Sequence, residues 1–383
     1  MSIIHVPIEN IPTRYTADWI DQFETAFKRT NTNFITVLGN TNKEIPIQTG
    51  SVLDAIGTSL YKNDQISKLI KMISNGEIKD DDVIFFADLW FPGIETLFYI
   101  RSLTGIQFKI AGIFHAGTWD SFDFTSRTGM RNWGQHLELS WLLGVDLIFV
   151  ATQFHKDMIV MNSGEFDDSK IFVTGIPFYA EELRQKYPFE SKENLIVFPH
   201  RCDEEKHPEK FDRLKRKYPQ WDFIKTLEVA NNRDEYFKLL ARSKVMISFA
   251  DQETFGYSTV ESMALGNYVI VPNRLSYRET VPIDYRYSKD KDIDSLLESF
   301  MENPNIPQYP ELLKWESSID KMLRVISVKL KEAVRNRQTQ EELVRSEQIR
   351  VETEKREKQA QREAKRAEKQ SEQSEQQEPK AGE

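Results

Sequence analysis

Cysteine is almost absent from this chain. Cys202 is the only one among 383 residues, so no internal disulfide can form. The first twelve residues, MSIIHVPIENIP, lack the basic segment and the long apolar segment of a secretion signal. We therefore expect a protein of a reducing compartment, the cytoplasm.

Long hydrophobic runs are also missing. The longest candidates, such as residues 142–152, are interrupted by Gly144 and Asp146. A membrane-spanning helix needs about 18 or more consecutive apolar residues. The sequence therefore predicts no membrane span.

Several common catalytic motifs do not occur. The first expected strand is not followed by Gly-x-Gly-x-x-Gly, and the chain has no Walker loop, no His-Glu-x-x-His and no cysteine cluster. These absences argue against a dehydrogenase, an NTPase and a metallohydrolase. They also predict that the protein holds no metal.

Excess positive charge is missing as well. The formal net charge is −9, and residues 331–383 carry 13 basic and 13 acidic residues, so the excess lies on the preceding body. Nonspecific binding to a phosphate backbone is driven by a cationic surface. Such binding is therefore not the expected main function, although a local basic groove remains compatible with the charge.

Apolar and aromatic residues are abundant. The chain is 39% hydrophobic, with 24 Phe, 13 Tyr and 7 Trp, which is enough to build real cores. Because single cores stop growing near ~250–300 residues, the length favours two domains and an extension.

Short apolar runs alternate with longer amphipathic stretches. The first series comprises residues 3–6, 34–38, 83–87, 108–114, 146–151 and 171–174. The second series comprises residues 195–198, 223–227, 245–249 and 268–271. Runs that are apolar on both faces are typical of buried parallel strands, and their alternation with helices predicts an α/β fold with two doubly wound sheets.

Four regions follow from this pattern. We expect an N-terminal Rossmann-like domain over residues 1–180, a C-terminal domain over 190–310, a helical segment over 311–350 and a charged low-complexity tail over 351–383. The tail can form an exposed helix through pairs of opposite charge four residues apart. A solvated charged helix is the simplest reading of the tail, and a coiled-coil partner is the alternative.

The most informative segment is SFADQETFGYSTVESMALGNYVIVPN, residues 248–273. Glu253 lies in a loop after an expected strand, and Glu261 lies eight residues later, inside the next helix. Gly256 allows the backbone to approach a ligand, and the helix that follows offers unpaired N–H groups. The segment therefore predicts an anion site at the edge of the sheet where ligands bind in doubly wound folds.

A second segment, FPHRCDEEKHPEKF, follows the first strand of the second series. Arg201 and Lys206 lie in this loop. Cations at this place can neutralise the charge that builds up on a departing diphosphate. Basic residues are common in loops, so Arg201 and Lys206 alone are weak evidence for an anion site. Their position relative to Glu253 and Glu261 strengthens that evidence.

The Glu-x7-Glu spacing, with Phe-Gly after the first Glu and then Glu-Ser-Met-Ala-x-Gly, resembles the donor-site signature of retaining glycosyltransferases of family 4. The resemblance implies the GT-B fold, in which two Rossmann-like domains with parallel sheets face a cleft. It implies that Glu253 contacts hydroxyls of the transferred sugar and that Glu261 holds the donor ribose. It also implies that the backbone at Phe255 and Gly256 approaches the sugar and the phosphate.

The same resemblance assigns the cationic pair. Arg201 and Lys206 match the family's Arg-x4-Lys pair, which grips the donor diphosphate. The implied reaction is a retaining hexosyl or pentosyl transfer that needs no metal and no cofactor beyond the nucleotide diphosphate-sugar donor.

Candidate residues of the first half are placed more loosely. The resemblance implies that His115, in IFHAGTWD, faces the donor sugar, and the alternative is a histidine held by local backbone. Asp88, Trp90 and Asp120 also follow expected strands, and an aromatic side chain beside a carboxylate suits a sugar or base acceptor. The first loop lacks the family's usual glycine pair, and Arg14 is the residue there that can reach a phosphate.

Residues 195–285 resemble the tRNA-queuosine mannosyltransferases still more closely, and the first half looks like that of phage base-modifying enzymes. We therefore expect an acceptor hydroxyl on a modified nucleobase, either hydroxymethylpyrimidine in phage DNA or a nucleoside of tRNA. The expected partners are the nucleotide-sugar donor and DNA or tRNA, and the sequence does not define the oligomeric state.

Three alternatives remain at this stage. A polysaccharide or lipid glycosyltransferase shares the donor half but usually carries an amphipathic membrane-docking patch, and none is clear in the sequence. A nucleotide-sugar epimerase would need acid and base residues that we do not find. A non-catalytic GT-B binding protein is disfavoured by the presence of the two glutamates and the two cations.

Overall fold

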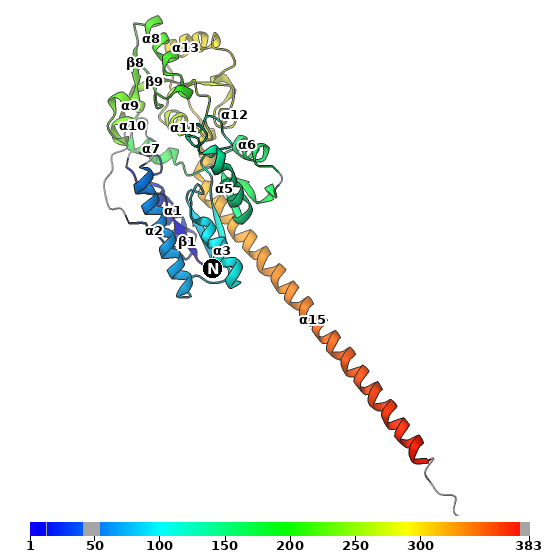
Figure 1. Cartoon of the computed structure of the whole chain (residues 1–383). Helices are drawn as coiled ribbons and strands as arrows, with labels where there is room; N and C mark the ends of the chain where they lie inside the picture. The colour runs from blue at the N-terminus through cyan, green and yellow to red at the C-terminus, as the bar shows by residue number, and fades with distance from the viewer. Residues whose placement is uncertain (13, 41–53, 165, 376–383) are drawn as a thin grey trace, which may run out of the picture. The chain divides into compact units, whose positions relative to one another are not determined.

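The structure is a computed structural model of the whole chain, and it describes residues 1–12, 14–40, 54–164 and 166–375, with side chains described as far as residue 365. The chain divides into two compact units, Met1–Ile326 and Ser327–Glu383. Figure 1 shows the elements of both units along the chain. Each unit is described by itself.

The N-terminal half of the first unit contains a parallel sheet of six strands in the order β2-β1-β3-β4-β5-β6. Its strands are β1 (Ile3–Val6), β2 (Phe34–Thr36), β3 (Val83–Phe86), β4 (Lys109–Ile113), β5 (Leu147–Val150) and β6 (Ile171–Val173). All six apolar runs of the first series form strands, so this part of the fold prediction is confirmed.

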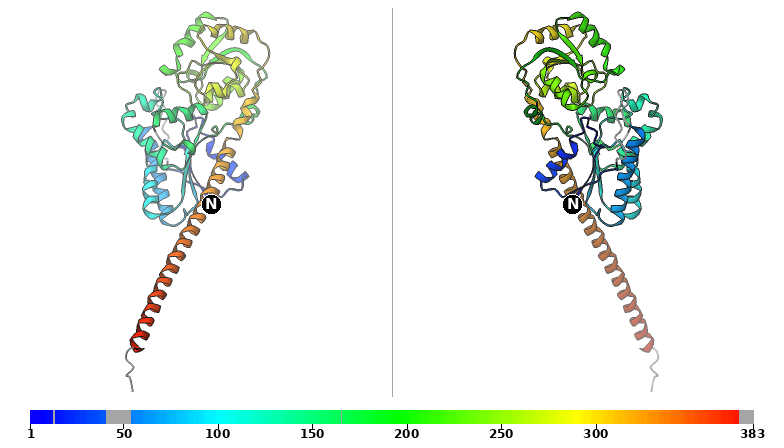
Figure 2. Two further views of the ribbon diagram at one scale, coloured as in Figure 1. Left: turned by 90° about the vertical axis from the view of Figure 1, so that its right-hand side faces the viewer. Right: turned by 90° about the vertical axis from the view of Figure 1, so that its left-hand side faces the viewer.

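Helices cover both faces of this sheet, as the two views of Figure 2 show. They are α1 (Trp19–Arg29), α2 (Ala55–Ser74), α3 (Ile94–Thr104), α4 (Phe124–Arg127), α5 (Arg131–Gly144) and α6 (Gln153–Ser163). Side chains of successive residues in β1 and β3 point to opposite faces, and both sets are buried. This two-sided burial explains why the strands read as continuous apolar runs.

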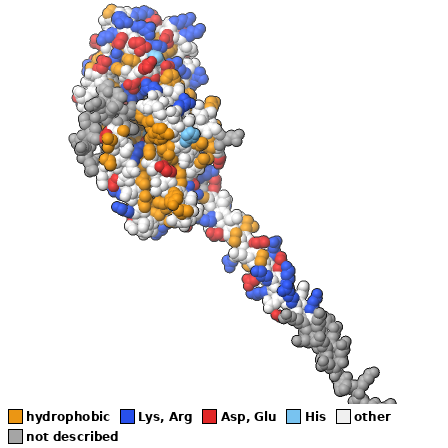
Figure 3. Space-filling model, in the orientation of Figure 1, with side chains coloured by type: hydrophobic (Ala, Val, Ile, Leu, Met, Phe, Trp, Pro, Cys, Tyr) orange, Lys and Arg blue, Asp and Glu red, His pale blue; other side chains and the backbone are white. Residues whose placement is uncertain are grey.

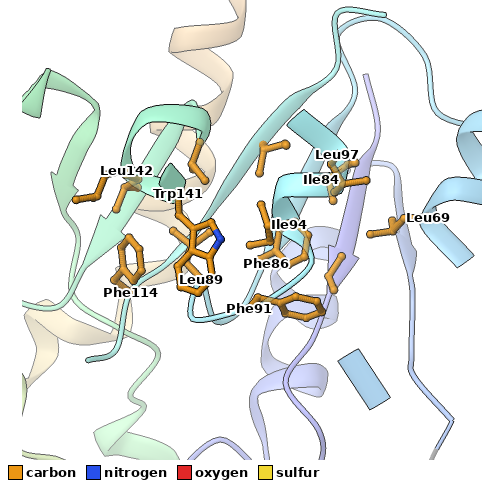
Figure 4. Close-up of a cluster of buried hydrophobic side chains, with 14 of the residues drawn as sticks. Leu69, Ile84, Phe86, Leu89, Phe91, Ile94, Leu97, Phe114, Trp141 and Leu142 are labelled. Atoms are coloured by element: carbon orange, nitrogen blue, oxygen red, sulfur yellow. The ribbon is translucent and has the colours of Figure 1, made fainter. Parts of the chain in front are cut away.

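One face of the sheet packs against α2, α3 and α5. Figure 4 shows this core, in which Ile84 and Phe86 of β3 lie near Ile94 of α3 and Trp141 of α5. Trp141 and Phe86 are fully buried. Burying side chains of this size stabilises the fold by roughly 1.5–3 kcal/mol each, and this core sets the position of the loops after β3 and β4.

The C-terminal half contains a second parallel sheet of five strands in the order β11-β10-β9-β7-β8. Its strands are β7 (Glu193–Phe198), β8 (Asp222–Lys225), β9 (Ser243–Ile247), β10 (Tyr268–Pro272) and β11 (Arg286–Tyr287). The four predicted runs are confirmed. The edge strand β11 was missed because two residues are too short to give a periodic signal.

Eight short helices surround this sheet and link it to its neighbours. They are α7 (Ala180–Lys186), α8 (Pro208–Lys217), α9 (Thr226–Val229), α10 (Arg233–Arg242), α11 (Tyr257–Ala264), α12 (Tyr277–Thr280), α13 (Asp292–Glu302) and α14 (Leu313–Glu316). Four turns of 3₁₀ helix occur at Asp168–Lys170, Glu204–Lys206, Ile283–Tyr285 and Pro310–Leu312. The predicted limits of the domains, at residues 180 and 190, fall between β6 and β7.

The last helix, α15 (Ser318–Glu375), continues through the predicted helical segment and into the charged tail. Its first turns belong to the first unit, where Ile319, Met322 and Ile326 are buried. In the second unit residues 341–365 are all exposed, and ion pairs such as Arg356–Glu352 at 2.9 Å connect successive turns. Among the described helices, none has both the length and the apolar character needed to cross a bilayer.

Removal of residues 339–383 is expected to leave the melting temperature of the body unchanged within a few degrees. The described residues beyond 340 bury no apolar side chain, and exposed ion pairs contribute little to stability. Differential scanning calorimetry of the truncated and full-length chains measures this directly. A larger drop in the melting temperature would show that the tail stabilises the body.

His5 is a buried polar residue in an apolar environment. It lies on β1 with no exposed surface, and its ring is 5.1 Å from Phe23 and 5.6 Å from Phe27 of α1. Neither ring nitrogen has a hydrogen-bond partner among the described residues. Burial lowers the pKa of His5 from 6.5 to about 3, so the imidazole is neutral in the folded protein.

This neutral histidine makes the fold sensitive to acid. Below pH ~6.5 His5 of the unfolded chain binds a proton, whereas His5 of the folded chain stays neutral until about pH 3. The contribution of His5 to the free energy of unfolding is therefore complete above pH ~6.5 and falls as the pH drops towards about 3. Between pH ~7.5 and ~5.5, His5→Leu should reduce the loss in the free energy of unfolding by about 1.4 kcal/mol. Urea unfolding at the two pH values measures the difference, with the exposed His136→Leu on α5 as control. Equal acid sensitivity in wild type and His5→Leu would contradict this account.

Candidate functional site

The loop between β9 and α11 forms the centre of the candidate site. Gly256 has a φ of 86°, in the left-handed region, and a Cβ added there would lie 3.2 Å from Cε1 of Tyr277. Glycine is therefore required for this turn into the helix N-terminus. The side chain of Phe255 is buried and packs edge-on against Trp315 at 5.2 Å, so the backbone of residues 255 and 256 is the part that can face a ligand.

Lys206 and Glu253 meet beside this loop. Lys206 ends the 3₁₀ turn Glu204–Lys206 and is buried, and its Nζ lies 2.9 Å from Oε1 of Glu253. It also donates a hydrogen bond to the carbonyl of Gln252. Two of the three ammonium hydrogens thus have partners among the described residues, which leaves one for a ligand oxygen.

Arg201 lies on the same loop in a more open position. Its side chain is 38% exposed, and its guanidinium forms ion pairs with Asp203 at 3.2 Å and Glu205 at 3.8 Å. Arg127, from the N-terminal half, contacts Glu205 at 3.0 Å. Glu205 therefore links the two halves, and Arg201 keeps an exposed face for an anion.

His200 was missed in the sequence, although it directly precedes Arg201. Its side chain is buried, and its Nδ1 lies 3.3 Å from Oγ of Ser258 and 3.7 Å from Oε1 of Glu253. Its Nε2 is buried without a partner among the described residues. Burial, together with the charges of Lys206 and Arg201, holds the pKa of His200 well below its usual value, so the ring is neutral.

His115 lies in the N-terminal half and contacts the same central loop. Its Nε2 donates to the carbonyl of Ala87 at 2.8 Å, so Nδ1 accepts the hydroxyl hydrogen of Tyr15 at 2.8 Å. Thr254 donates to the carbonyl of His115 at 2.9 Å. Burial lowers the pKa of His115. The predicted contact of His115 with a donor sugar stays a prediction, because both ring nitrogens have protein partners here.

Tyr15 was also missed in the sequence. Its ring stacks on Tyr257 at a centroid distance of 4.3 Å, and Tyr257 begins α11. Tyr15 and Tyr257 are too far apart in the sequence for any motif spacing to predict their contact. The stack and the hydrogen bond to His115 place the first loop of the N-terminal half against the start of α11.

Asp88 and Trp90 follow β3. Oδ1 of Asp88 accepts the backbone N–H of Trp90 at 2.9 Å, and Oδ2 lies 3.4 Å from Nζ of Lys62. The indole of Trp90 donates to Glu138 at 2.8 Å. Burial lowers the pKa of Arg14, and the nearby charges of Asp88 and Arg201 raise and lower it respectively.

Asp120 follows β4 and reaches the C-terminal half. It is buried and accepts the backbone N–H of Phe122 at 2.9 Å. Burial raises the pKa of Asp120, and Lys206 and the side chain of Gln252 act in the opposite direction. Asp120 therefore lies close to the Lys206–Glu253 pair, where it can accept a hydrogen bond from a bound hydroxyl.

Glu261 occupies a separate, buried position on α11. Its two carboxylate oxygens accept hydrogen bonds from Arg233 at 2.9 Å and from the hydroxyl of Tyr236 at 2.9 Å. It lines a hollow of about 430 Å³ together with Arg233, Tyr257 and Trp19. Each carboxylate oxygen can accept a further hydrogen bond, so a hydroxyl can still bind there.

A larger hollow of about 700 Å³ lies beside the loops that hold Trp90 and Arg201, and we call it the tryptophan hollow. Its lining includes Lys62, Trp90, Phe124, Arg127, Trp133 and Arg201. The structure thus brings Glu253, Lys206, Arg201, His115 and Asp120 around one loop. Glu261 and Trp90 each line a neighbouring hollow.

Over the residues that the structure describes, no group of three or more His, Cys, Asp or Glu is arranged to hold a metal ion. The predicted independence of a metal remains a prediction that requires a measurement.

Solved structures share this architecture. Sucrose-phosphate synthase from Thermosynechococcus elongatus superimposes with a TM-score of 0.56 at 11% identity, over 88% of this chain and 98% of that one. The catalytic domain of starch synthase IV from Arabidopsis thaliana, bound to ADP and acarbose, superimposes with a TM-score of 0.58 at 10% identity, over 86% and 99%. The fold is therefore of the GT-B type, as the sequence predicted.

Sequence comparison finds a more limited similarity. The chain is 35% identical over 74 residues to the tRNA-queuosine alpha-mannosyltransferase of Drosophila melanogaster, which is 19% of this chain and 20% of that enzyme. The match thus spans one fifth of the length of that relative. No family model matches the chain.

Proposed function

We propose that this protein is a cytoplasmic glycosyltransferase that moves a sugar from a nucleotide diphosphate-sugar to an acceptor hydroxyl. The observation that carries the proposal is the ion pair of Lys206 with Glu253 in the loop before α11, with Arg201 on the same loop as Lys206. Two cations and a helix N-terminus suit a diphosphate, and an adjacent carboxylate suits sugar hydroxyls. The GT-B fold, shared with a starch synthase that binds ADP, supports this reading.

The chemistry follows from these positions. Arg201 and Lys206 stabilise the negative charge that develops on the diphosphate as the glycosidic bond breaks. In a retaining transfer, the acceptor hydroxyl attacks the face from which the diphosphate leaves, and the leaving phosphate oxygen takes the proton of that hydroxyl. Glu253 orients the sugar, and no enzymic nucleophile is needed.

For the acceptor we favour a hydroxyl on a modified nucleobase, in tRNA or in phage DNA. The partial similarity to a tRNA-queuosine mannosyltransferase supports this choice. Trp90 offers an aromatic surface and Asp88 a carboxylate beside it, and Asp120 offers a second carboxylate near Lys206. Aromatic stacking is the usual means by which proteins recognise unpaired bases.

Glu261 provides the sharpest test of the donor site. If its carboxylate holds the ribose, Glu261→Ala should weaken binding of the free nucleotide diphosphate by about ten- to a hundredfold, because hydrogen bonds to charged groups contribute roughly 1.5–3 kcal/mol. Calorimetry with UDP, GDP and ADP measures the affinity. Glu261→Gln should recover part of it, since the amide oxygen can still accept the hydrogen bond of Arg233 while the amide NH2 donates to the hydroxyl of Tyr236.

Exposed Glu302→Gln on α13 serves as the control for this test. Glu253→Gln should differ from Glu261→Ala, because it loses turnover of the sugar donor while binding of the free nucleotide survives. Arg201→Ala should lower turnover by about a hundredfold or more, since the cation acts on the transition state. Unchanged nucleotide binding by a folded Glu261→Ala variant would overturn the ribose assignment.

We also expect turnover to persist in the presence of a chelator. Arg201 and Lys206 supply positive charge at the place where other enzymes use a divalent cation. Steady-state rates with and without EDTA measure this. Loss of activity in EDTA, restored by magnesium or manganese, would refute the metal-independent mechanism.

A second candidate function has one observation in its favour. Figure 3 shows hydrophobic side chains gathered on the surface of the N-terminal half. Tyr99 and Leu103 of α3 are 67% and 69% exposed, and Leu143 of α5 is 61% exposed. Exposed apolar patches mark interaction surfaces, so a polysaccharide or lipid acceptor docked on this face is the alternative to a nucleobase.

A further inference from the structure

We propose that the tryptophan hollow is the binding site for one unpaired nucleotide of a nucleic-acid acceptor, whose base stacks on Trp133 and packs against Trp90. This inference rests on the proposed glycosyl transfer and specifies where its acceptor binds. The hollow has a volume of about 700 Å³, within the range of small-molecule sites. A single nucleotide fits such a volume and a duplex does not, so the base must be unpaired or flipped out.

Trp90 forms a rigid wall of the hollow. Its indole N–H is fixed by Glu138 at 2.8 Å, and its ring packs edge-on against the buried Trp141 at 5.5 Å. Glu138 is buried and also accepts the backbone N–H of Thr118 at 2.8 Å. A ring held this firmly loses little conformational entropy when a base packs against it.

Trp133 supplies a second aromatic surface. It lies in the first turn of α5, 6.4 Å from Trp90 between ring centroids, and it is 51% exposed. No core contact requires a side chain of this size at a half-exposed position. An exposed indole beside a fixed one at the rim of a hollow is the arrangement expected of a stacking platform.

The charges around the hollow define the kind of ligand. Lys62, Arg127 and Arg201 line it together with the carboxylates of Asp203 and Glu204, and Lys62 and Arg127 also pair with Asp88 and Glu205. The three cations offer donors to one phosphate group, but the site as a whole is nearly neutral. Affinity must therefore come from stacking, and salt should weaken binding only slightly.

The hollow adjoins the donor site. Arg201 lines the hollow and lies on the same loop as Lys206, which contacts Glu253. Burial raises the pKa of Asp123, the N-cap of α4, and the charges of Arg201 and Arg127 lower it. The hollow is lined by Arg201, Asp203 and Glu204, the stretch of the loop that directly precedes Lys206, so a hydroxyl on a base bound there can be directed towards the donor.

The test uses full-length protein and short single-stranded RNA and DNA oligonucleotides. Calorimetry should show binding that Trp133→Ala weakens by about five- to a hundredfold, the range for loss of one base–aromatic stack. Trp133→Phe should retain most of the affinity. Leu143→Ala, also an exposed apolar residue of α5 but outside the lining, is the matched control and should bind as wild type does.

Other ligands provide the competing outcomes. Binding of a short maltooligosaccharide, or of vesicles of phosphatidylcholine and phosphatidylglycerol, with the same dependence on Trp133 and no binding of oligonucleotides, would overturn the proposal. Equal oligonucleotide affinity of wild type and Trp133→Ala would also overturn it. A steep salt dependence would show binding through the phosphate backbone and not through stacking.

Measurements on the donor separate this inference from the proposed function. Trp133→Ala should bind the nucleotide diphosphate, and slowly hydrolyse the sugar donor, as wild type does. If the donor binds and reacts but no oligonucleotide binds, the acceptor inference fails and the glycosyltransferase proposal stands. If oligonucleotides bind through Trp133 but no nucleotide diphosphate binds, the glycosyltransferase proposal fails.

Discussion

The ion pair between Lys206 and Glu253 is the interaction on which the candidate site depends. The two residues come from loops after β7 and β9, which are neighbours in the second sheet. Both groups are largely removed from water, and a buried ion pair recovers the cost of desolvation only when further hydrogen bonds complete it. Lys206 also bonds the carbonyl of Gln252, which fixes the loop that leads to Gly256 and α11. Removing either charge would leave the other buried and unpaired.

Topology explains why the sequence could predict that Arg201, Lys206 and Glu253 lie at one edge of the second sheet. Arg201 and Lys206 follow one strand and Glu253 follows its neighbour, and the carboxyl ends of parallel strands lie at the same edge of a sheet. The same reasoning places the loops of Arg14, Asp88 and His115 together, because β1, β3 and β4 are adjacent. The strands themselves were predictable because they are apolar on both faces.

What the sequence did not reveal depends on contacts between distant elements. Glu261 accepts hydrogen bonds from two residues of α10, Arg233 and Tyr236. His115 bonds to the hydroxyl of Tyr15. Each of these contacts depends on how helices and loops pack in three dimensions. No regular spacing in the sequence predicts such a contact. His200 is different, because it stands beside Arg201 in the segment that we had singled out. Its burial and its unpartnered Nε2 became evident only in three dimensions.

The charge of the body and the composition of the tryptophan hollow are consistent with each other. A chain with a net charge of −9 repels phosphate backbones at long range, so a nucleic-acid acceptor would not be held by its backbone. Short-range stacking on Trp133, with Trp90 beside it, does not depend on net charge, because apolar ring surfaces supply the contact. Such a protein would pass over paired nucleic acid and hold only an unpaired base that fits the hollow. The lack of long-range attraction therefore favours selectivity for the acceptor, and it lowers the rate at which protein and acceptor meet.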